Sequence, residues 1–356
     1  MRVVIAGAGV IGASIAWHLA ARGCRDIRVV DRGHDLGVGE GSTGKATGGF
    51  RCQFGTEVNV RLSLLSRQKL LRFEDEIGVD SGYRQCGYLF LIRTDEELTE
   101  LNAAQKIQHA CGSSEPRMID RREALEINPA VYDPDVRGAA FCPTDGFIQP
   151  LQILRGYAEA ARRLGVRFEF ETDVRKLEPG VTYVNAGGAW ASELAPIPVT
   201  PLRRRIACTV PTNVLPETMP MTIWAGDGFH ARVRDGRVML LLPDDPPDDE
   251  RWLPELLQRA HARLPCLRNI AIDPQHSWSG LYEMSPDRHA IIGWHPVVPD
   301  LFLANGSSGH GVMHAPAIGQ IAAEMILDGK AASVDVHVLR PTRFAEGEPV
   351  SGPALL

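Results

Sequence analysis

The chain has 356 residues, of which 44% are hydrophobic and 23% charged, values typical of a globular protein long enough for two joined domains. This composition excludes disordered and collagen-like chains, and a net charge of −6 without basic clusters argues against nucleic acid as a partner. The seven cysteines are scattered and never form a CxxC pair, so we expect reduced thiols, no disulfide framework and no metal site.

The first predicted unit is a strand, a helix and a second strand. Residues 2–6 (RVVIA) are continuously apolar, which is typical of a strand buried on both faces of a parallel sheet. Residues 11–22 carry apolar side chains at helical spacing, and residues 27–31 (IRVVD) predict the second strand. The three segments together predict a βαβ unit.

The strand and helix of this unit are joined by GAGVIG, which places Gly7, Gly9 and Gly12 in the G-x-G-x-x-G spacing. The first glycine permits a tight turn, the second lets the backbone approach a pyrophosphate, and the third lets the helix pack closely on the strand. Asp31 ends the second strand, where a carboxylate accepts hydrogen bonds from ribose hydroxyls. We therefore predict an adenine-dinucleotide site, because a purely structural turn would need these residues by coincidence.

Later segments predict more helices and strands of the same sheet. Residues 167–172 and 182–190 are expected to return to the first sheet as strands. Amphipathic spacing predicts helices at 58–78, 150–165 (begun by Pro150), 251–263 and about 312–328 (ended by Gly329).

Two regions with alternating apolar and polar residues, 83–95 and 206–242, predict an antiparallel sheet that faces a cavity on one side. The Asp-Gly pair within 233–238 is a hairpin signal. The acidic run at 244–250 is interpreted as a solvated loop rather than a metal site.

The segment 39–55 (GEGSTGKATGGFRCQFG) distinguishes between the two common dinucleotides. Asp31 suits FAD and NAD equally, since both expose ribose hydroxyls. A second stretch rich in glycine and hydroxyl groups favours FAD, because a permanently bound flavin needs additional contacts along its pyrophosphate and ring. An NAD-linked dehydrogenase remains an alternative.

Several segments resemble the FAD-dependent D-amino acid oxidase superfamily, which includes glycine oxidase and the sarcosine oxidases, especially the branch of the sarcosine oxidase β subunit and related proline dehydrogenases. They occur in the family's order over nearly the whole chain. One departure is the short passage 176–181, where relatives carry a small three-stranded excursion. The matching segments are GAGVIGASIAWHLAARG, STGKATGGFRCQFG, CGYLFL (86–91), DGFIQP (145–150), NAGGAWA (185–191), SGLYEMSPDRHAIIG (279–293) and NGSSGHGVMHAPAIGQ (305–320).

The resemblance implies an α/β fold with a Rossmann-like FAD-binding domain of the glutathione reductase type and an inserted α+β substrate domain on an antiparallel or mixed sheet. The expected boundaries are 1–82, 144–204 and 285–340 for the FAD-binding domain, 83–143 and 205–284 for the substrate domain, and 341–356 for a tail.

The resemblance also implies the residues that contact FAD. Lys45 resembles a basic residue near the flavin, where it would assist oxygen reduction or bind pyrophosphate. Gly280 stands where monomeric sarcosine oxidase has its flavin-linking cysteine, so we expect non-covalent FAD. The cofactor-binding candidates are Gly7, Gly9, Val10, Ile11, Gly12, Asp31, Arg32, Ser42, Thr43, Lys45, Ala46, Thr47, Gly48, Gly49, Val174, Ala186, Gly187, Trp190, Gly280, Gly306, Ser308, Gly309, His310, Gly311, Val312 and Met313.

Four residues are substrate-binding candidates, and three residues, Arg51, His310 and Tyr282, are catalytic candidates. Arg51 aligns with the arginine that binds substrate carboxylate in monomeric sarcosine oxidase, although an inserted residue shifts the register and pairing with an FAD phosphate or a surface acid is the alternative. Tyr282 and Met313 replace cations of relatives, and they either line an apolar pocket or belong to the core. His230 aligns with a substrate-facing tyrosine of glycine oxidase, with a core or surface histidine as the alternative.

These observations predict an FAD-dependent amine oxidoreductase acting on an amino acid or an N-substituted glycine. A hydride would pass to flavin N5, water would hydrolyse the imine, and oxygen would yield H2O2. The alternative is a flavin dehydrogenase, or a subunit of a heteromeric sarcosine or proline dehydrogenase-type complex, with another acceptor. Homo- and hetero-oligomers both stay open. No segment reaches the length of a membrane span and Met1 leads directly into a strand, so we expect a cytoplasmic protein.

Overall fold

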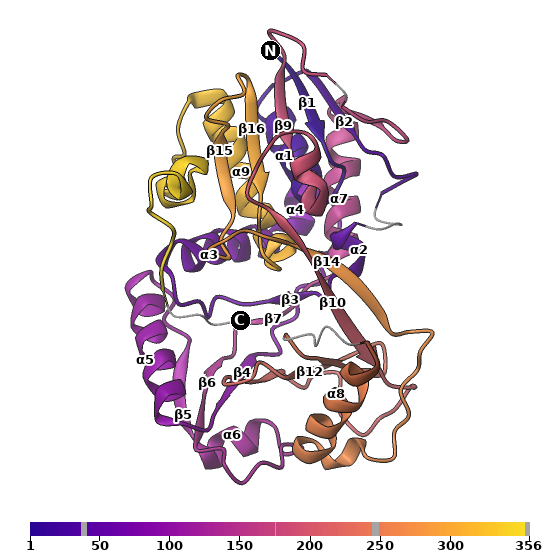
Figure 1. Ribbon diagram of the computed structural model, residues 1–356, viewed down its shortest axis with the longest axis vertical. Helices are drawn as coiled ribbons and strands as arrows, with labels where there is room; N and C mark the ends of the chain where they lie inside the picture. The colour runs from indigo at the N-terminus through magenta and orange to yellow at the C-terminus, as the bar shows by residue number, and fades with distance from the viewer. Residues whose placement is uncertain (37–40, 175, 244–248, 353–356) are drawn as a thin grey trace.

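The computed structural model describes residues 1–36, 41–174, 176–243 and 249–352, and it has two parts stacked along the long axis of the molecule (Figure 1). The upper part is built on a six-stranded sheet and the lower part on an eight-stranded sheet. Strands β10 (Thr200–Cys208) and β14 (Trp278–Met284) run from one part to the other. The domain boundaries given above stay a prediction.

The six-stranded sheet contains the predicted βαβ unit, formed by β1 (Arg2–Ala6), α1 (Val10–Ala21) and β2 (Asp26–Val30). The strand order is β15-β16-β9-β1-β2-β8, and every pair of neighbours is parallel except β15 with β16. The other strands are β8 (Arg167–Glu169), β9 (Thr182–Asn185), β15 (Ile291–Trp294) and β16 (Leu301–Asn305).

Helix α1 packs against both α7 (Pro150–Arg163) and α9 (Gly311–Asp328), and their apolar residues form the core of the upper part. A Cβ atom at Gly319 of α9 would lie 2.1 Å from the Ser14 Oγ of α1. The two helices therefore cross closely at a point where only glycine fits.

The eight-stranded sheet has the order β14-β10-β13-β12-β11-β4-β6-β5. Its neighbours are antiparallel except β4 and β11, so the predicted antiparallel sheet is mixed. Residues Asp235 and Gly236 join β12 to β13 with φ of 54° and 68°, which confirms the predicted hairpin. The remaining strands are β4 (Tyr88–Ile92), β5 (Arg117–Asp120), β6 (Gly138–Cys142), β11 (Met221–Trp224), β12 (His230–Arg234) and β13 (Arg237–Leu241).

One face of this sheet packs against helices α6 (Arg121–Ile127) and α8 (Asp249–Arg263) through a buried cluster that includes Trp224, Phe229 and Leu256. The opposite face is turned toward the upper part. Helix α5 (Asp95–Ala110) lies along the side of the lower part (Figure 1). The smaller elements are α2 (Ser42–Lys45), α3 (Glu57–Leu71), α4 (Phe73–Ile77), β3 (Gly49–Phe50), β7 (Gly146–Phe147) and the 3-10 turns Gly188–Glu193, Pro265–Leu267, His337–Leu339 and Pro341–Phe344.

Four predicted elements are wrong in extent. The strand expected at 167–172 ends at Glu169. The helix expected at 58–78 breaks at Arg72, where the backbone φ is −105°. The strand expected at 182–190 ends at Asn185, because Gly188 takes a φ of 56° and opens a 3-10 turn. The alternation at 83–95 yields only the five-residue strand β4, since helix α5 starts at Asp95.

Among residues 1–36, 41–174, 176–243 and 249–352, no helix combines the length and apolarity needed to cross a bilayer. No group of three or more metal-ligating side chains occurs among the same residues. Residues 39 and 40 of the glycine-rich segment and most of the acidic run, 244–248, lie outside the description.

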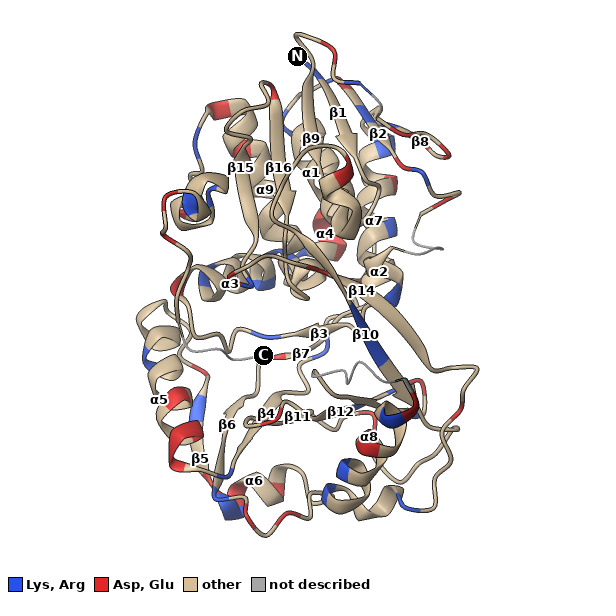
Figure 2. Ribbon diagram, in the orientation of Figure 1, with Lys and Arg blue, Asp and Glu red and all other residues tan. Residues whose placement is uncertain are grey.

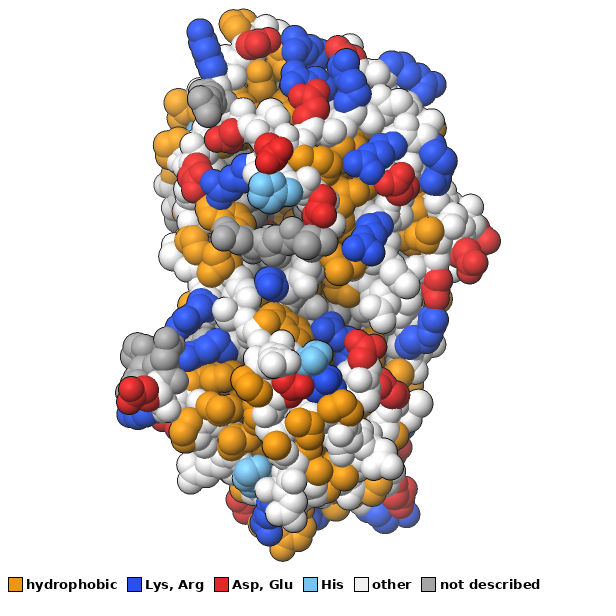
Figure 3. Space-filling model, turned by 90° about the vertical axis from the view of Figure 1, so that its right-hand side faces the viewer, with side chains coloured by type: hydrophobic (Ala, Val, Ile, Leu, Met, Phe, Trp, Pro, Cys, Tyr) orange, Lys and Arg blue, Asp and Glu red, His pale blue; other side chains and the backbone are white. Residues whose placement is uncertain are grey.

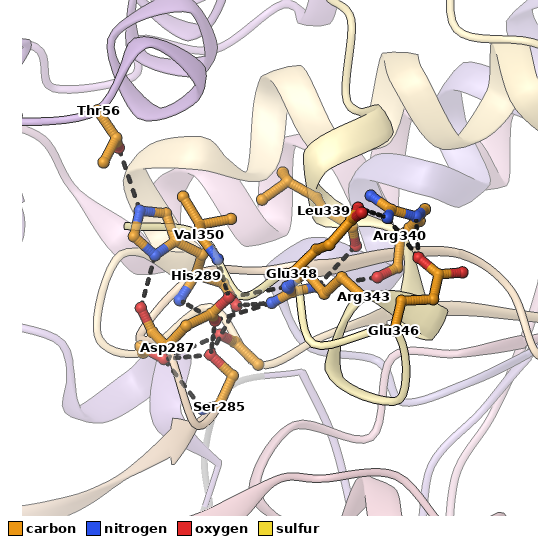
Figure 4. Close-up of polar contacts among 12 residues, drawn as sticks. Thr56, Ser285, Asp287, His289, Leu339, Arg340, Arg343, Glu346, Glu348 and Val350 are labelled. Atoms are coloured by element: carbon orange, nitrogen blue, oxygen red, sulfur yellow. Dashed lines mark hydrogen bonds and ion pairs between the residues drawn. The ribbon is translucent and has the colours of Figure 1, made fainter. Parts of the chain in front are cut away.

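The segment assigned to a tail is anchored by a buried ion pair. Arg343 donates from Nε and Nη2 to the two carboxylate oxygens of Asp287 at 2.8 and 2.9 Å, and the two side chains are 0% and 4% exposed. Arg343 also donates to the Leu339 and His289 carbonyls, as Figure 4 shows. The tail therefore fixes the turn that follows β14.

We expect Arg343→Met to lower the free energy of unfolding by about 3–5 kcal/mol, because it leaves the buried Asp287 carboxylate without its cation. Urea unfolding followed by circular dichroism measures the change. The matched control is Arg22→Met, since the Arg22–Asp328 pair is 38% and 45% exposed and should contribute less than about 1 kcal/mol. Equal effects of the two substitutions would contradict a structural role for the tail.

Candidate active site

A cavity of about 940 Å³ lies between the two sheets, near the upper end of the usual range for small-molecule sites. It is walled by the start of α1, the end of β2, α2, the start of α9 and one face of the eight-stranded sheet. On the face of the molecule in Figure 3, several Lys and Arg side chains lie near mid-height, where the upper and lower parts meet.

The fold brings the predicted site residues together around this cavity. All cofactor-binding candidates line it except Gly12 and Gly306, and so do the four substrate-binding candidates. A Cβ atom at Gly12 would lie 2.0 Å from the Gly7 carbonyl oxygen, so this glycine serves the helix–strand packing expected of the third position. Gly306 has a φ of 67° and lies against Ser285 and Ile291.

The loop between β1 and α1 forms one end of the cavity. Gly7 has a φ of 110°, and a Cβ there would lie 2.3 Å from the Ala186 carbonyl oxygen, so the tight turn requires glycine. The Asp31 carboxylate accepts hydrogen bonds from the N–H of Ala8 at 2.7 Å and of Gly33 at 2.7 Å. These bonds hold the carboxylate at the cavity wall, where the ribose of a dinucleotide is expected.

Gly9 differs from the other two glycines of the motif. Its φ of −69° and ψ of 177° are open to any residue, and a Cβ would meet only the Thr43 Oγ1 at 3.5 Å. Among the described residues, nothing therefore requires glycine at this position. Close approach of a ligand to the backbone supplies the missing reason, so this loop fits a bound pyrophosphate.

The start of helix α9 forms another wall of the cavity. His310 is its N-cap residue, and the first N–H groups of the helix have no acceptor within it, so they offer donors and the positive end of the helix dipole. Gly309 has a φ of 92°, and a Cβ there would lie 2.5 Å from the Tyr282 ring. Glycine thus lets Tyr282 pack directly on the loop.

Arg51 is 4% exposed and lies in the cavity wall between the two sheets. Its Nη1 donates to the Gln53 carbonyl at 2.7 Å and its Nη2 to the His310 Nε2 at 3.2 Å. Its guanidinium lies 4.1 Å from the Phe54 ring centroid. Burial lowers the pKa of Arg51 to about 10, so the side chain stays cationic at neutral pH.

Asp145 supports the backbone that carries Arg51, and sequence reasoning missed this role. It is fully buried, accepts the Cys52 N–H at 2.7 Å and accepts the Gln53 side-chain amide at 3.1 Å. Burial raises the pKa of Asp145 to about 6. The sequence did draw attention to Asp145, which is the first residue of the DGFIQP motif. A single acidic residue in a turn, however, gives no indication of which residue it contacts.

His230 lies on β12 and lines the cavity. The Nδ1–H donates to the Gly228 carbonyl at 2.7 Å, which fixes the tautomer and leaves Nε2 as an acceptor. Burial lowers the pKa of His230 to about 4, so the ring is neutral at pH 7. The ring is half-buried and lines the cavity, and its role toward a substrate stays a prediction.

Glu283 is a second cavity residue that sequence reasoning missed. It is 8% exposed, its Oε1 accepts the Ser307 N–H at 3.2 Å, and its Oε2 has no partner among the described residues. Burial raises the pKa of Glu283 to about 6. The residue follows Tyr282 in the SGLYEMSP segment, and alternation along β14 gave no reason to select it.

The comparisons with known proteins agree with this geometry. The family model described as "FAD dependent oxidoreductase" (DAO) matches residues 2–325. A glycine oxidase of Geobacillus kaustophilus is 27% identical over 96% of each chain, and the Xenopus laevis FAD-dependent oxidoreductase domain-containing protein 1 is 26% identical over 98% of this chain and 83% of its own.

Solved structures show the same fold. The L-proline dehydrogenase from P. horikoshii superposes with a TM-score of 0.87 and 29% identity, covering 98% of this chain and 99% of its own. The glycine oxidase from G. kaustophilus superposes with a TM-score of 0.81 over 96% and 98% of the two chains. The predicted α/β flavoprotein fold is confirmed, and the NAD-linked alternative falls away. The glycine-lined loop, the held Asp31 carboxylate and the family match lead to one conclusion: the chain is an FAD-binding member of the FAD-dependent oxidoreductase family.

Proposed function

We propose that this oxidoreductase acts on an amino acid or an N-substituted glycine and releases an imine that water hydrolyses. Bound FAD supplies the redox chemistry by accepting a hydride from the carbon next to the amine. The protein's own residues bind the substrate carboxylate, orient the amine and exclude water. The observation that carries this proposal is the buried, cationic Arg51 in the cavity wall.

Arg51 suits a carboxylate because its planar guanidinium donates two parallel hydrogen bonds. The side chain is held in place at both ends, by the Gln53 carbonyl and by His310. Aromatic rings of Phe54 and Phe90 lie 4.1 and 5.5 Å from it and restrict its motion. A carboxylate bound there is fixed in orientation as well as position.

In this proposal His230 contacts the amine of the substrate. Its Nε2 lone pair accepts an N–H, since Nδ1 is already a donor to Gly228. A neutral imidazole in the cavity favours the secondary or deprotonated amine, the form that loses a hydride readily. Tyr282 and Met313 offer apolar surface to a substituent, in place of the cations found in some relatives.

The start of α9 favours negative charge in the cavity. Its first N–H groups and helix dipole would hold negative charge on a ligand in the cavity, such as FAD, and the low polarity of the site would strengthen this effect.

The proposed acceptor is oxygen, with H2O2 as product. The alternative is a dehydrogenase that passes electrons to another acceptor or to a partner subunit, and the 29% identity to an L-proline dehydrogenase over nearly the whole chain favours it. Non-covalent attachment of FAD remains part of the proposal, since Gly280 offers no nucleophile.

Anaerobic mixing of the FAD-loaded protein with N-methyl, N-carboxymethyl, D- and L-amino acids tests this function. At least one class should bleach the visible flavin band, and admission of air should restore the colour and form H2O2. Bleaching without reoxidation by air, reversed by a quinone or dye, supports the dehydrogenase. Failure of every compound to bleach the flavin contradicts the proposed function.

A further inference from the structure

We propose that the substrate carries a second carboxylate on its substituent and that Arg204 binds it; this inference rests on the proposed function. The substrate class is then an amino acid or glycine whose N-substituent or side chain ends in a carboxylate. Arg51 would bind the carboxylate next to the reacting carbon, and Arg204 the distal one.

Arg204 stands in the middle of a run of three arginines on β10, visible as the blue stretch of that strand in Figure 2. In the β10–β14 register, Arg204 pairs with Gly280, two residues before Tyr282. Because side chains alternate between faces, Arg204 and Tyr282 share the face that lines the cavity. The Arg204 guanidinium lies 5.9 Å from the centre of the Tyr282 ring.

Arg204 has no carboxylate within ion-pair distance among the described residues, and no hydrogen bond from its guanidinium is found there either. Other arginines of the lower part behave differently: Arg237 on β13 pairs with Asp273 at 2.8 Å, and Arg263 on α8 pairs with Asp227 at 2.8 Å. A half-buried guanidinium in a cavity wall is stabilised by a bound anion. An anionic group of a ligand in the cavity supplies this partner.

Arg204 and Arg51 act on the same part of the cavity. After the larger effect of burial, both guanidiniums lower the pKa of His230, and both counteract the rise in the pKa of Tyr282. His230 and Tyr282 thus feel the charge of both cations, and all four side chains line the same cavity. A substrate bound by Arg51 and extended along these two side chains presents its substituent to Arg204.

The test compares N-(carboxyalkyl)glycines of increasing length with N-alkylglycines of the same length, using the FAD-loaded wild-type protein and Arg204→Gln. We expect the wild type to prefer one dicarboxylate over its uncharged match, and Arg204→Gln to lower kcat/KM for that compound about 10- to 100-fold. The N-alkylglycine should change less than about threefold. Arg204→Lys should restore part of the loss, because it keeps the charge.

The matched control is Arg203→Gln, which removes a charge from the same strand but from its opposite face. It should leave both kcat/KM values and the FAD content unchanged. A binding readout uses saturated aliphatic dicarboxylates and monocarboxylates as unreactive probes, with the shift of the flavin spectrum reporting affinity. Only the dicarboxylates should bind more weakly to Arg204→Gln.

Three results would overturn the inference. The first is equal use of mono- and dicarboxylates by wild type and variant, with bleaching intact, which removes the role of Arg204 and leaves the proposed function standing. The second is loss of FAD from Arg204→Gln, which assigns the cation to the cofactor. The third is absence of bleaching by every compound, which removes the proposed function and the inference with it.

Discussion

Replacing Gly9 by valine is expected to abolish FAD retention while the chain still folds. The backbone at Gly9 accepts any residue, and a Cβ meets no atom of the described residues closer than 3.5 Å, so we expect the folded protein to tolerate the side chain. A pyrophosphate lying against this backbone does not. A clash of a few kcal/mol lowers affinity by at least about tenfold, so purified Gly9→Val should hold less than about a tenth of the wild-type flavin.

The ratio of visible to ultraviolet absorbance after gel filtration measures the flavin content, and circular dichroism measures the fold. Gly12→Val is the matched comparison, because its Cβ would lie 2.0 Å from the Gly7 carbonyl oxygen and the chain itself should fail to fold. A folded Gly9→Val protein with a full complement of FAD would disprove the assignment of this loop to the pyrophosphate.

Replacing Arg51 by glutamine is expected to lower kcat/KM for the true substrate by about two to three orders of magnitude. The substitution removes the cation that would pair with the substrate carboxylate, while leaving a shorter, uncharged polar side chain in a site that is 4% exposed. The loss should fall mainly on KM, because the pairing acts on bound substrate and transition state alike.

Arg51→Lys separates charge from geometry. A lysine keeps the charge but donates from a single point, so it should restore only part of the activity. FAD content must remain at the wild-type level in both variants. Unchanged kinetics in Arg51→Gln would exclude Arg51 from substrate binding. Loss of flavin would instead assign Arg51 to FAD binding, which is the alternative given for this residue in the sequence analysis.

The dinucleotide end of the site could be predicted from the sequence because its residues form a local motif. The three glycines and Asp31 lie within one βαβ unit, where spacing along the chain fixes spacing in the fold. The start of α9 was also predicted, since glycines before an apolar helix mark its beginning.

The substrate side was less predictable because its residues meet only through the eight-stranded sheet. Asp145 reaches Cys52 across 93 residues of chain, and Arg204 meets Tyr282 across β10 and β14. No pattern in one segment encodes such contacts. Helix α5 was missed for a different reason. Its start could be recognised, because Thr94 accepts the N–H of Glu97 in the manner of a capping box, but the alternation before it favoured a strand.

The close crossing of α1 and α9 at Ser14 and Gly319 fixes the distance between the two helix starts that line the cofactor site. Both helices begin at the cavity, one beside the anchoring loop and the other at His310, and they cannot slide past each other without a collision. The separation of the two anchoring points is thus built into the scaffold. A ligand held at both points has to span this fixed separation.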